Sequence, residues 1–148
     1  MFVLCSASNK YVDNKVNEYK EFLSLLHVIK QKIATCGTKI PVILESMDKF
    51  EYPCLCLFIK KAIDNGIYQA FIEHEKNFCI NRDDKKILKS CFFDMGRNML
   101  NAELQNIDQC IQIIQESYEK ARCKSSSDKK VNNTVIICIT LLVLILIV

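Results

Sequence analysis

Cysteine and histidine are the side chains in this sequence that could ligate a metal or act as nucleophiles. The chain of 148 residues has nine cysteines and two histidines, His27 and His74. The spacing of His74 and Cys79 matches no zinc pattern. A Cys–His nucleophile pair would need two side chains that the fold brings together, and no local signature supports one. The cysteines form no CxxC pair and are odd in number, so they predict no disulfide framework.

The charged side chains form no catalytic group either. Lys85, Lys86 and Lys89 are a basic cluster that fits a solvated helix face better than a phosphate site. The sequence has no Gly-rich phosphate loop and no G-x-S-x-G motif. The net charge of +3 is too small to indicate a nucleic-acid partner. We therefore expect a protein that is not an enzyme and that uses no cofactor or metal.

The C-terminal segment is the most apolar part of the chain. Thirteen of the fourteen residues from Val135 to Val148 are apolar, and no face of the segment is polar. Their insertion into a bilayer is favourable by on the order of 5 kcal/mol in total. A buried core helix is the alternative at this length. We expect a transmembrane anchor over residues 131–148, with these representative residues: Val131, Val135, Ile139, Leu142, Leu146 and Val148.

Four basic residues precede this segment: Arg122, Lys124, Lys129 and Lys130. Asp128 alone opposes them, and no charged side chain follows. Because positively charged residues stay on the cytoplasmic side of a membrane, we expect a single-pass protein with a cytosolic domain. The same basic residues would attract anionic lipid by about 1 kcal/mol per charge.

A heptad pattern of apolar residues lies before the polar stretch, over residues 101–124. Its members recur in steps of three and four: Leu104, Ile107, Ile111, Ile114, Tyr118 and Ala121. This spacing places them on one face of a helix about 36 Å long. A similar stripe occurs over residues 12–36. We expect the two stripes to face each other, because each would otherwise expose a ribbon of large apolar side chains.

Shorter helices are expected between these two. Gly37 and Gly66 are typical of helix ends, whereas Pro41 and Pro53 are typical of helix starts. No alternation typical of strands occurs. The sequence therefore predicts an all-α fold, a single bundle of about six helices with a C-terminal transmembrane helix. The expected parts are a poorly ordered lead-in at 1–11, the bundle at 12–124, a polar linker at 125–130 and the anchor at 131–148.

Several short segments, taken in order, resemble a known family. The segment Lys32–Leu44 is similar to the E-I-x-Y-x-x-x-P-L segment of stage III sporulation protein AB. The residues around Phe71 stand where that family has an A-W motif. Phe93–Met99 resembles its F-G-x-x-L-G turn, and Glu103 takes the place of the aspartate that follows. The same long final helix and membrane tail come next.

Five departures from the family pattern stand out. Lys32 replaces a glutamate, and the proline is displaced from position 39 to Pro41. Phe71 replaces a tryptophan, and Leu100 replaces the second glycine of the turn. The segment Met1–Ser8 is too short for the N-terminal membrane helix of the family.

The resemblance implies a cell-membrane protein of sporulation, with its helical domain on the mother-cell side. That domain resembles the cytoplasmic domains of the platform protein of type II secretion and type IV pilus machines. The implied partners are other stage III sporulation proteins, including an ATPase, and a homo-oligomer is compatible with this reading. We therefore expect a non-enzymatic scaffold. The alternatives are a tail-anchored adaptor unrelated to sporulation and a thiol or metal enzyme.

Overall fold

The computed structural model consists of six α-helices and two short 3-10 segments, with no strand in the residues described. It describes the backbone of residues 2–47 and 49–147, and the side chains of 10–47, 50–128, 130–131, 134–135 and 137–139. The α-helices are α1 (Phe2–Cys36), α2 (Ile40–Glu45), α3 (Cys56–Asn65), α4 (Ile67–His74), α5 (Arg82–Asp94) and α6 (Leu100–Ile147). The 3-10 segments are η1 (Lys49–Glu51) and η2 (Glu75–Asn77). The all-α class predicted from the sequence is confirmed.

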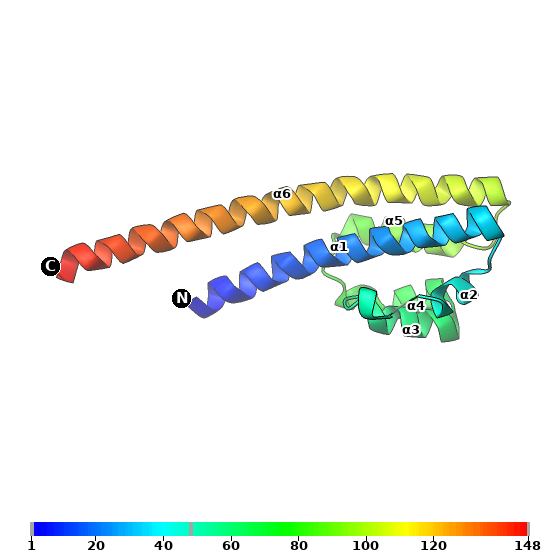
Figure 1. Ribbon diagram of the computed structural model, residues 1–148, viewed down its shortest axis with the longest axis horizontal. Coiled ribbons are helices and arrows are strands. Elements are labelled where there is room, and N and C mark those ends of the chain that lie inside the picture. Colours follow the sequence, from blue (N-terminus) through cyan, green and yellow to red (C-terminus); the bar gives the residue numbers. More distant parts are fainter. Residues whose placement is uncertain (1, 48, 148) are drawn as a thin grey trace.

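The two long helices, α1 and α6, lie side by side in opposite directions, and the shorter helices lie along one flank of α1 (Figure 1). The Lys30 ammonium lies 2.5 Å from the Asp108 carboxylate at one end of the pair. Ser125 donates a hydrogen bond to Asp13 toward the other end. Apolar residues of both helices, such as Ile29 of α1 and Ile107 of α6, lie in one buried core, as the two stripes predict.

An aromatic cluster forms the centre of the core. Phe22 of α1 lies with its ring centroid between 5.1 and 6.5 Å from four other phenylalanine rings: Phe58, Phe71, Phe78 and Phe92. All four pairs are tilted or edge-on, which is the arrangement that the ring quadrupole favours. Each buried phenylalanine contributes about 1.5–3 kcal/mol from the removal of apolar surface from water. The cluster therefore fixes α3, α4 and α5 against α1.

The lead-in expected at 1–11 overlaps the first helix. The structure has α1 beginning at Phe2 rather than near Val12. No glycine or proline interrupts the first 36 residues, so nothing in the backbone ends the helix between Phe2 and Tyr11. Met1 lies outside the described residues.

Residues 125–130, expected to form a polar linker, are helical, because α6 runs without a break from Leu100 to Ile147. Serine and aspartate cost only a few tenths of a kcal/mol each relative to good helix formers. Ser125 is buried against α1, where its hydroxyl meets Asp13. This tertiary contact and the helix on either side outweigh the weak local preference.

Within the residues described, none of the helices combines the length and the apolar character that a membrane span requires. The side chains of Leu142, Leu146 and Val148, which the sequence assigns to the anchor, lie outside the described residues.

Candidate functional site

The heptad residues of α6 face the bundle. Ile107 and Ile114 are fully buried in the core. Leu104, Ile111 and Tyr118 are partly buried and pack against it. The neighbouring Ile113 is 40% exposed, so the helix has distinct inner and outer faces. The inner face joins α6 to both α1 and α5.

A buried polar network connects three helices beside these apolar residues. Tyr19 of α1 donates its hydroxyl hydrogen to the carboxylate of Asp84, and Ser117 of α6 donates to the other carboxylate oxygen at 2.9 Å. The Tyr19 oxygen in turn accepts the Asn81 backbone N–H at 3.1 Å. Burial and the Asp84 carboxylate together raise the pKa of Tyr19. These hydrogen bonds satisfy polar groups within the bundle and fix the α1–α5–α6 arrangement.

Two glutamates on one face of α1 hold the loops before α3 and α5. Glu21 accepts hydrogen bonds from the backbone N–H groups of Cys54 and Leu55, at 3.2 and 2.9 Å. Glu18 accepts from the N–H of Cys79 at 2.5 Å and from that of the following residue at 3.2 Å. Burial raises the pKa of Glu18, and these two N–H groups counteract part of that rise. Both carboxylates are therefore engaged in holding loops.

The cysteine thiols are poorly suited to nucleophilic chemistry where their surroundings shift the pKa. Burial and the nearby Glu21 raise the pKa of Cys54 to about 12. Burial and Glu18 raise the pKa of Cys79. A hydrogen bond with Cys110, together with burial, raises the pKa of Cys91. A raised pKa lowers the fraction of thiolate, which is the reactive form.

His74, a candidate metal ligand, lies against the backbone of its own helix. The Nδ1 atom of His74 lies 3.3 Å from the carbonyl oxygen of Ala70, one turn earlier on α4. Across the part of the chain described, no group of three or more His, Cys, Asp or Glu side chains could hold a metal ion.

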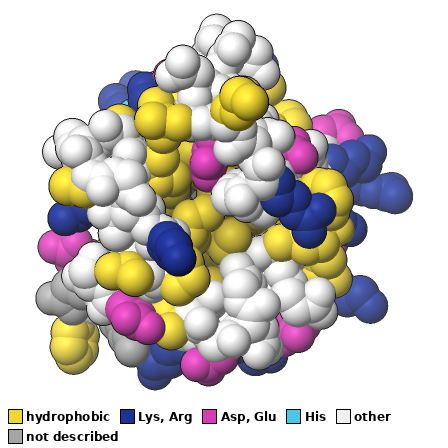
Figure 2. Space-filling model, turned by 90° about the vertical axis from the view of Figure 1, so that its right-hand side faces the viewer, with side chains coloured by type: hydrophobic (Ala, Val, Ile, Leu, Met, Phe, Trp, Pro, Cys, Tyr) yellow, Lys and Arg dark blue, Asp and Glu magenta, His cyan; other side chains and the backbone are white. Residues whose placement is uncertain are grey.

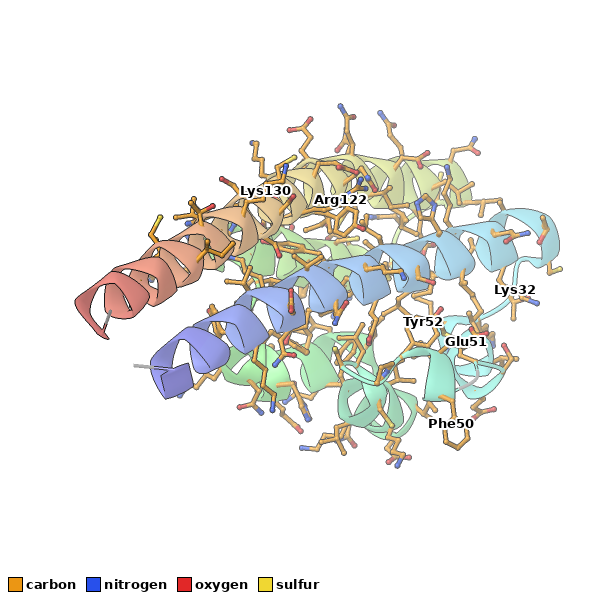
Figure 3. The ribbon with its side chains drawn as sticks, turned by 60° about the vertical axis from the view of Figure 1, so that its left-hand side comes forward. Lys32, Phe50, Glu51, Tyr52, Arg122 and Lys130 are labelled. Atoms are coloured by element: carbon orange, nitrogen blue, oxygen red, sulfur yellow. The ribbon has the colours of Figure 1, made fainter. Side chains whose placement is uncertain are left out.

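Three of the four basic residues before the apolar tail lie on the exposed surface of α6. Arg122, Lys124 and Lys130 are exposed, and the side chain of Lys129 lies outside the described residues. The Arg122 guanidinium is 3.9 Å from the Glu119 carboxylate, an exposed contact that contributes about 0–1 kcal/mol. Figure 3 shows Arg122 and Lys130 along this part of α6, at the other end of the bundle from Lys32. They therefore add positive charge next to the apolar end.

The apolar end of α6 extends past the start of α1 (Figure 1). Val131, Val135 and Ile139 have exposed fractions of 58, 47 and 43%. A side chain that belonged to the core of the bundle would lie below a tenth. These three residues are therefore outside the bundle core.

A pocket that the sequence did not predict lies at the opposite end of the bundle. It has a volume of about 510 Å³. Half of its fourteen lining residues are apolar: Ile33, Ile40, Pro41, Ala62, Ile67, Met95 and Leu100. Its charged lining residues are Lys39 and Glu103.

Three glycine turns meet at this pocket. Gly37 follows α1, Gly66 separates α3 from α4, and Gly96 lies between α5 and α6. Each has a positive φ, of 57°, 88° and 78°, which favours glycine over other residues. Glycines at three helix ends were therefore the only feature of the sequence that pointed to this region. The sequence did not predict that the three helix ends lie close together.

The family model for stage III sporulation protein AB matches residues 3–148. The chain belongs to the stage III sporulation protein AB family. Searches of curated proteins and of solved structures each return no significant match. The resemblance read from the short motifs is confirmed.

Two of the segments that resemble the family include residues that line the pocket. The segment Lys32–Leu44 contributes the wall from Ile33 to Pro41. The segment Phe93–Met99 contributes Met95, Gly96 and Asn98, and Glu103 lines the pocket from the first turn of α6. Phe71, in the position of the family tryptophan, is instead fully buried in the aromatic core.

Proposed function

We propose that this protein is a non-enzymatic, membrane-anchored component of the sporulation complex that joins mother cell and forespore. In this role it acts as a scaffold for partner proteins, including an ATPase. The observation that carries the proposal is that one helix, α6, includes both the buried face of the bundle and the apolar C-terminal end. Its 48 residues correspond to about 72 Å. An anchor that continues a helix of the bundle would hold the bundle at the membrane surface.

The surroundings of the apolar end support an anchor with the bundle in the mother-cell cytosol. Val131, Val135 and Ile139 are exposed, and the sequence beyond them is almost entirely apolar. Exposed apolar side chains in a continuous run are unfavourable in water. The exposed basic residues Arg122 and Lys130 precede the run, as expected for a segment that enters the membrane from the cytoplasmic side.

The interior of the bundle supports a scaffold rather than an enzyme. Its buried carboxylates hold loops and hydroxyl groups in place, and the thiols with a shifted pKa are less reactive than a free cysteine. The surface is therefore the part of the molecule that would act on partners. The family match favours a sporulation role over an adaptor unrelated to sporulation.

Flotation of the full chain with vesicles of phosphatidylethanolamine and phosphatidylglycerol tests the anchor. A variant carrying Ile139→Lys and Leu142→Lys should stay at the bottom of the gradient. Each lysine near the bilayer centre costs about 2.5–3.5 kcal/mol, so two cancel the gain expected from the whole segment. The wild type should float with the vesicles.

The matched control carries Gln109→Lys and Gln112→Lys, two exposed positions of α6 within the bundle. It adds the same charge and should float like the wild type. Flotation of both variants alike would contradict the anchor.

Co-purification of a stage III sporulation ATPase with the wild type, and its loss when the bundle is unfolded, tests the scaffold role.

A further inference from the structure

The pocket between the three glycine turns has the size and lining of a binding site. Its volume of about 510 Å³ lies within the range of about 300–1,000 Å³ that is typical of ligand pockets. Figure 2 views this end of the molecule and shows an apolar floor recessed between polar side chains. Leu100 lines the pocket and is 50% exposed, and the adjacent Met99 is 87% exposed. An apolar side chain entering the pocket would therefore find apolar surface at both the floor and the rim.

Of the two charged side chains that line the pocket, Glu103 has stabilising partners within the protein and Lys39 has no ion-pair partner among the residues described. Glu103 is buried, and its carboxylate accepts the Gly96 backbone N–H at 2.8 Å. It also lies in the first turn of α6, where the helix dipole stabilises a negative charge. Lys39 is exposed and has no ion-pair partner among the residues described. The charge left for an occupant to neutralise is therefore positive.

The position of the pocket excludes lipid as its occupant. Leu100 and Val135 are 35 residues apart on one continuous helix, a separation of about 52 Å. If the segment from Val135 enters a bilayer, the pocket stands well outside the headgroup region. Its occupant must then be soluble. This step rests on the proposed function.

We propose that the pocket binds an apolar side chain flanked by a carboxylate, presented by a soluble partner protein. The apolar group fills the cavity between the glycine turns, and an adjacent Asp or Glu pairs with Lys39. Lys39 precedes the first turn of α2 and makes no side-chain capping hydrogen bond there. Its replacement therefore changes the charge of the rim without removing a contact that the fold needs.

The chain offers a direct readout, because its three glycines all line this pocket. Isotope-labelled glycine in the full chain, held in detergent micelles, gives three amide signals in an NMR spectrum, and each reports on the site. The probe is the peptide acetyl-Glu-Phe-Glu-amide. We expect saturable shifts of these signals, with a Kd on the order of 1 mM. Lys39→Glu should weaken the binding by about fivefold or more, because it places like charges together.

One protein variant and two further peptides serve as controls, and they separate the effect of charge on binding from that of the apolar side chain. Lys120→Glu makes the same charge change on an exposed part of α6 about 30 Å along the helix from Leu100, and it should leave the affinity unchanged. The peptides acetyl-Lys-Phe-Lys-amide and acetyl-Glu-Ala-Glu-amide should bind more weakly than the probe. Equal shifts with all three peptides, or no shift with the probe, would overturn the proposal.

A second titration with a purified stage III sporulation ATPase distinguishes this proposal from the proposed function. Broadening of the glycine signals in the wild type, and not in Lys39→Glu, would support both. Binding of the peptide without binding of the ATPase would uphold the pocket chemistry and contradict the ATPase partnership. Binding of the ATPase that leaves the glycine signals unchanged would support the scaffold and overturn the pocket as its docking site.

Discussion

Asp84 connects three helices through hydroxyl groups that come from distant parts of the sequence. Its two carboxylate oxygens accept from Tyr19 of α1 and Ser117 of α6, while Asp84 itself lies in the first turn of α5. A buried carboxylate without such donors would be strongly unfavourable. The network is therefore specific to this arrangement of helices.

Asp84→Ala should destabilise the bundle. The change removes hydrogen bonds to a charged group, each contributing about 1.5–3 kcal/mol, and leaves the Tyr19 and Ser117 hydroxyls without their acceptor. We expect the free energy of unfolding to fall by about 2–4 kcal/mol, measured by urea denaturation. The neighbouring Asp83→Ala is the control, since Asp83 makes only an exposed ion pair with Lys86 at 3.1 Å. Equal losses in the two variants would count against the network.

The pH dependence of stability should report on Glu18. Burial raises the pKa of this carboxyl group in the folded protein above its value of 4.5 in the unfolded chain. Between these two pKa values the folded state binds more protons than the unfolded state. The stabilisation of the folded state by protonation of Glu18 is therefore complete below pH 4.5, and it is lost as the pH rises through the folded pKa. Glu18→Gln should therefore gain stability relative to the wild type as the pH rises from 4 to 7. A difference between the two unfolding free energies that does not change with pH would contradict this account.

At the scale of the elements, α6 has two roles along one helix. Its N-terminal part presents an apolar face to α1 and α5, and its C-terminal end extends past the start of α1. The heptad spacing made the first role predictable, because residues three and four apart share a helix face. The continuation of the helix through 125–130 was not predictable from local preference, because it also involves the contact of Ser125 with Asp13 of α1, a residue far away in the sequence.

Charged substitutions on the two faces of α6 should have very different effects. Ile114→Asp places a carboxylate in the fully buried core and removes a large apolar side chain, so we expect it to unfold the bundle, with a loss of about 4 kcal/mol or more. Ile111→Asp, at a partly buried position, should cost less. Thermal denaturation followed by circular dichroism measures both.

Ile113→Asp is the matched control for this pair, because residue 113 is 40% exposed on the other face of the same turn. It should shift the melting temperature only slightly. Similar melting temperatures for the variants at 113 and 114 would show that α6 does not pack through its heptad face.

At the scale of the whole molecule, the two ends of the bundle differ in character. One end carries exposed basic residues and the apolar end of α6, and the other carries a pocket formed by three turns. The first end could be read from the sequence, because its residues are contiguous. The pocket could not, because Gly37, Gly66 and Gly96 come together only through the packing of five helices.

The count of heat-resistant spores tests the central claim most directly. Cells that express the variant with Ile139→Lys and Leu142→Lys should form far fewer spores than the wild type, on the scale of a deletion of the gene. Cells that express the variant with Gln109→Lys and Gln112→Lys should form spores normally. Normal spore counts from the first variant, with its protein present at wild-type levels, would contradict the account that a bundle fixed to the membrane by α6 performs the function.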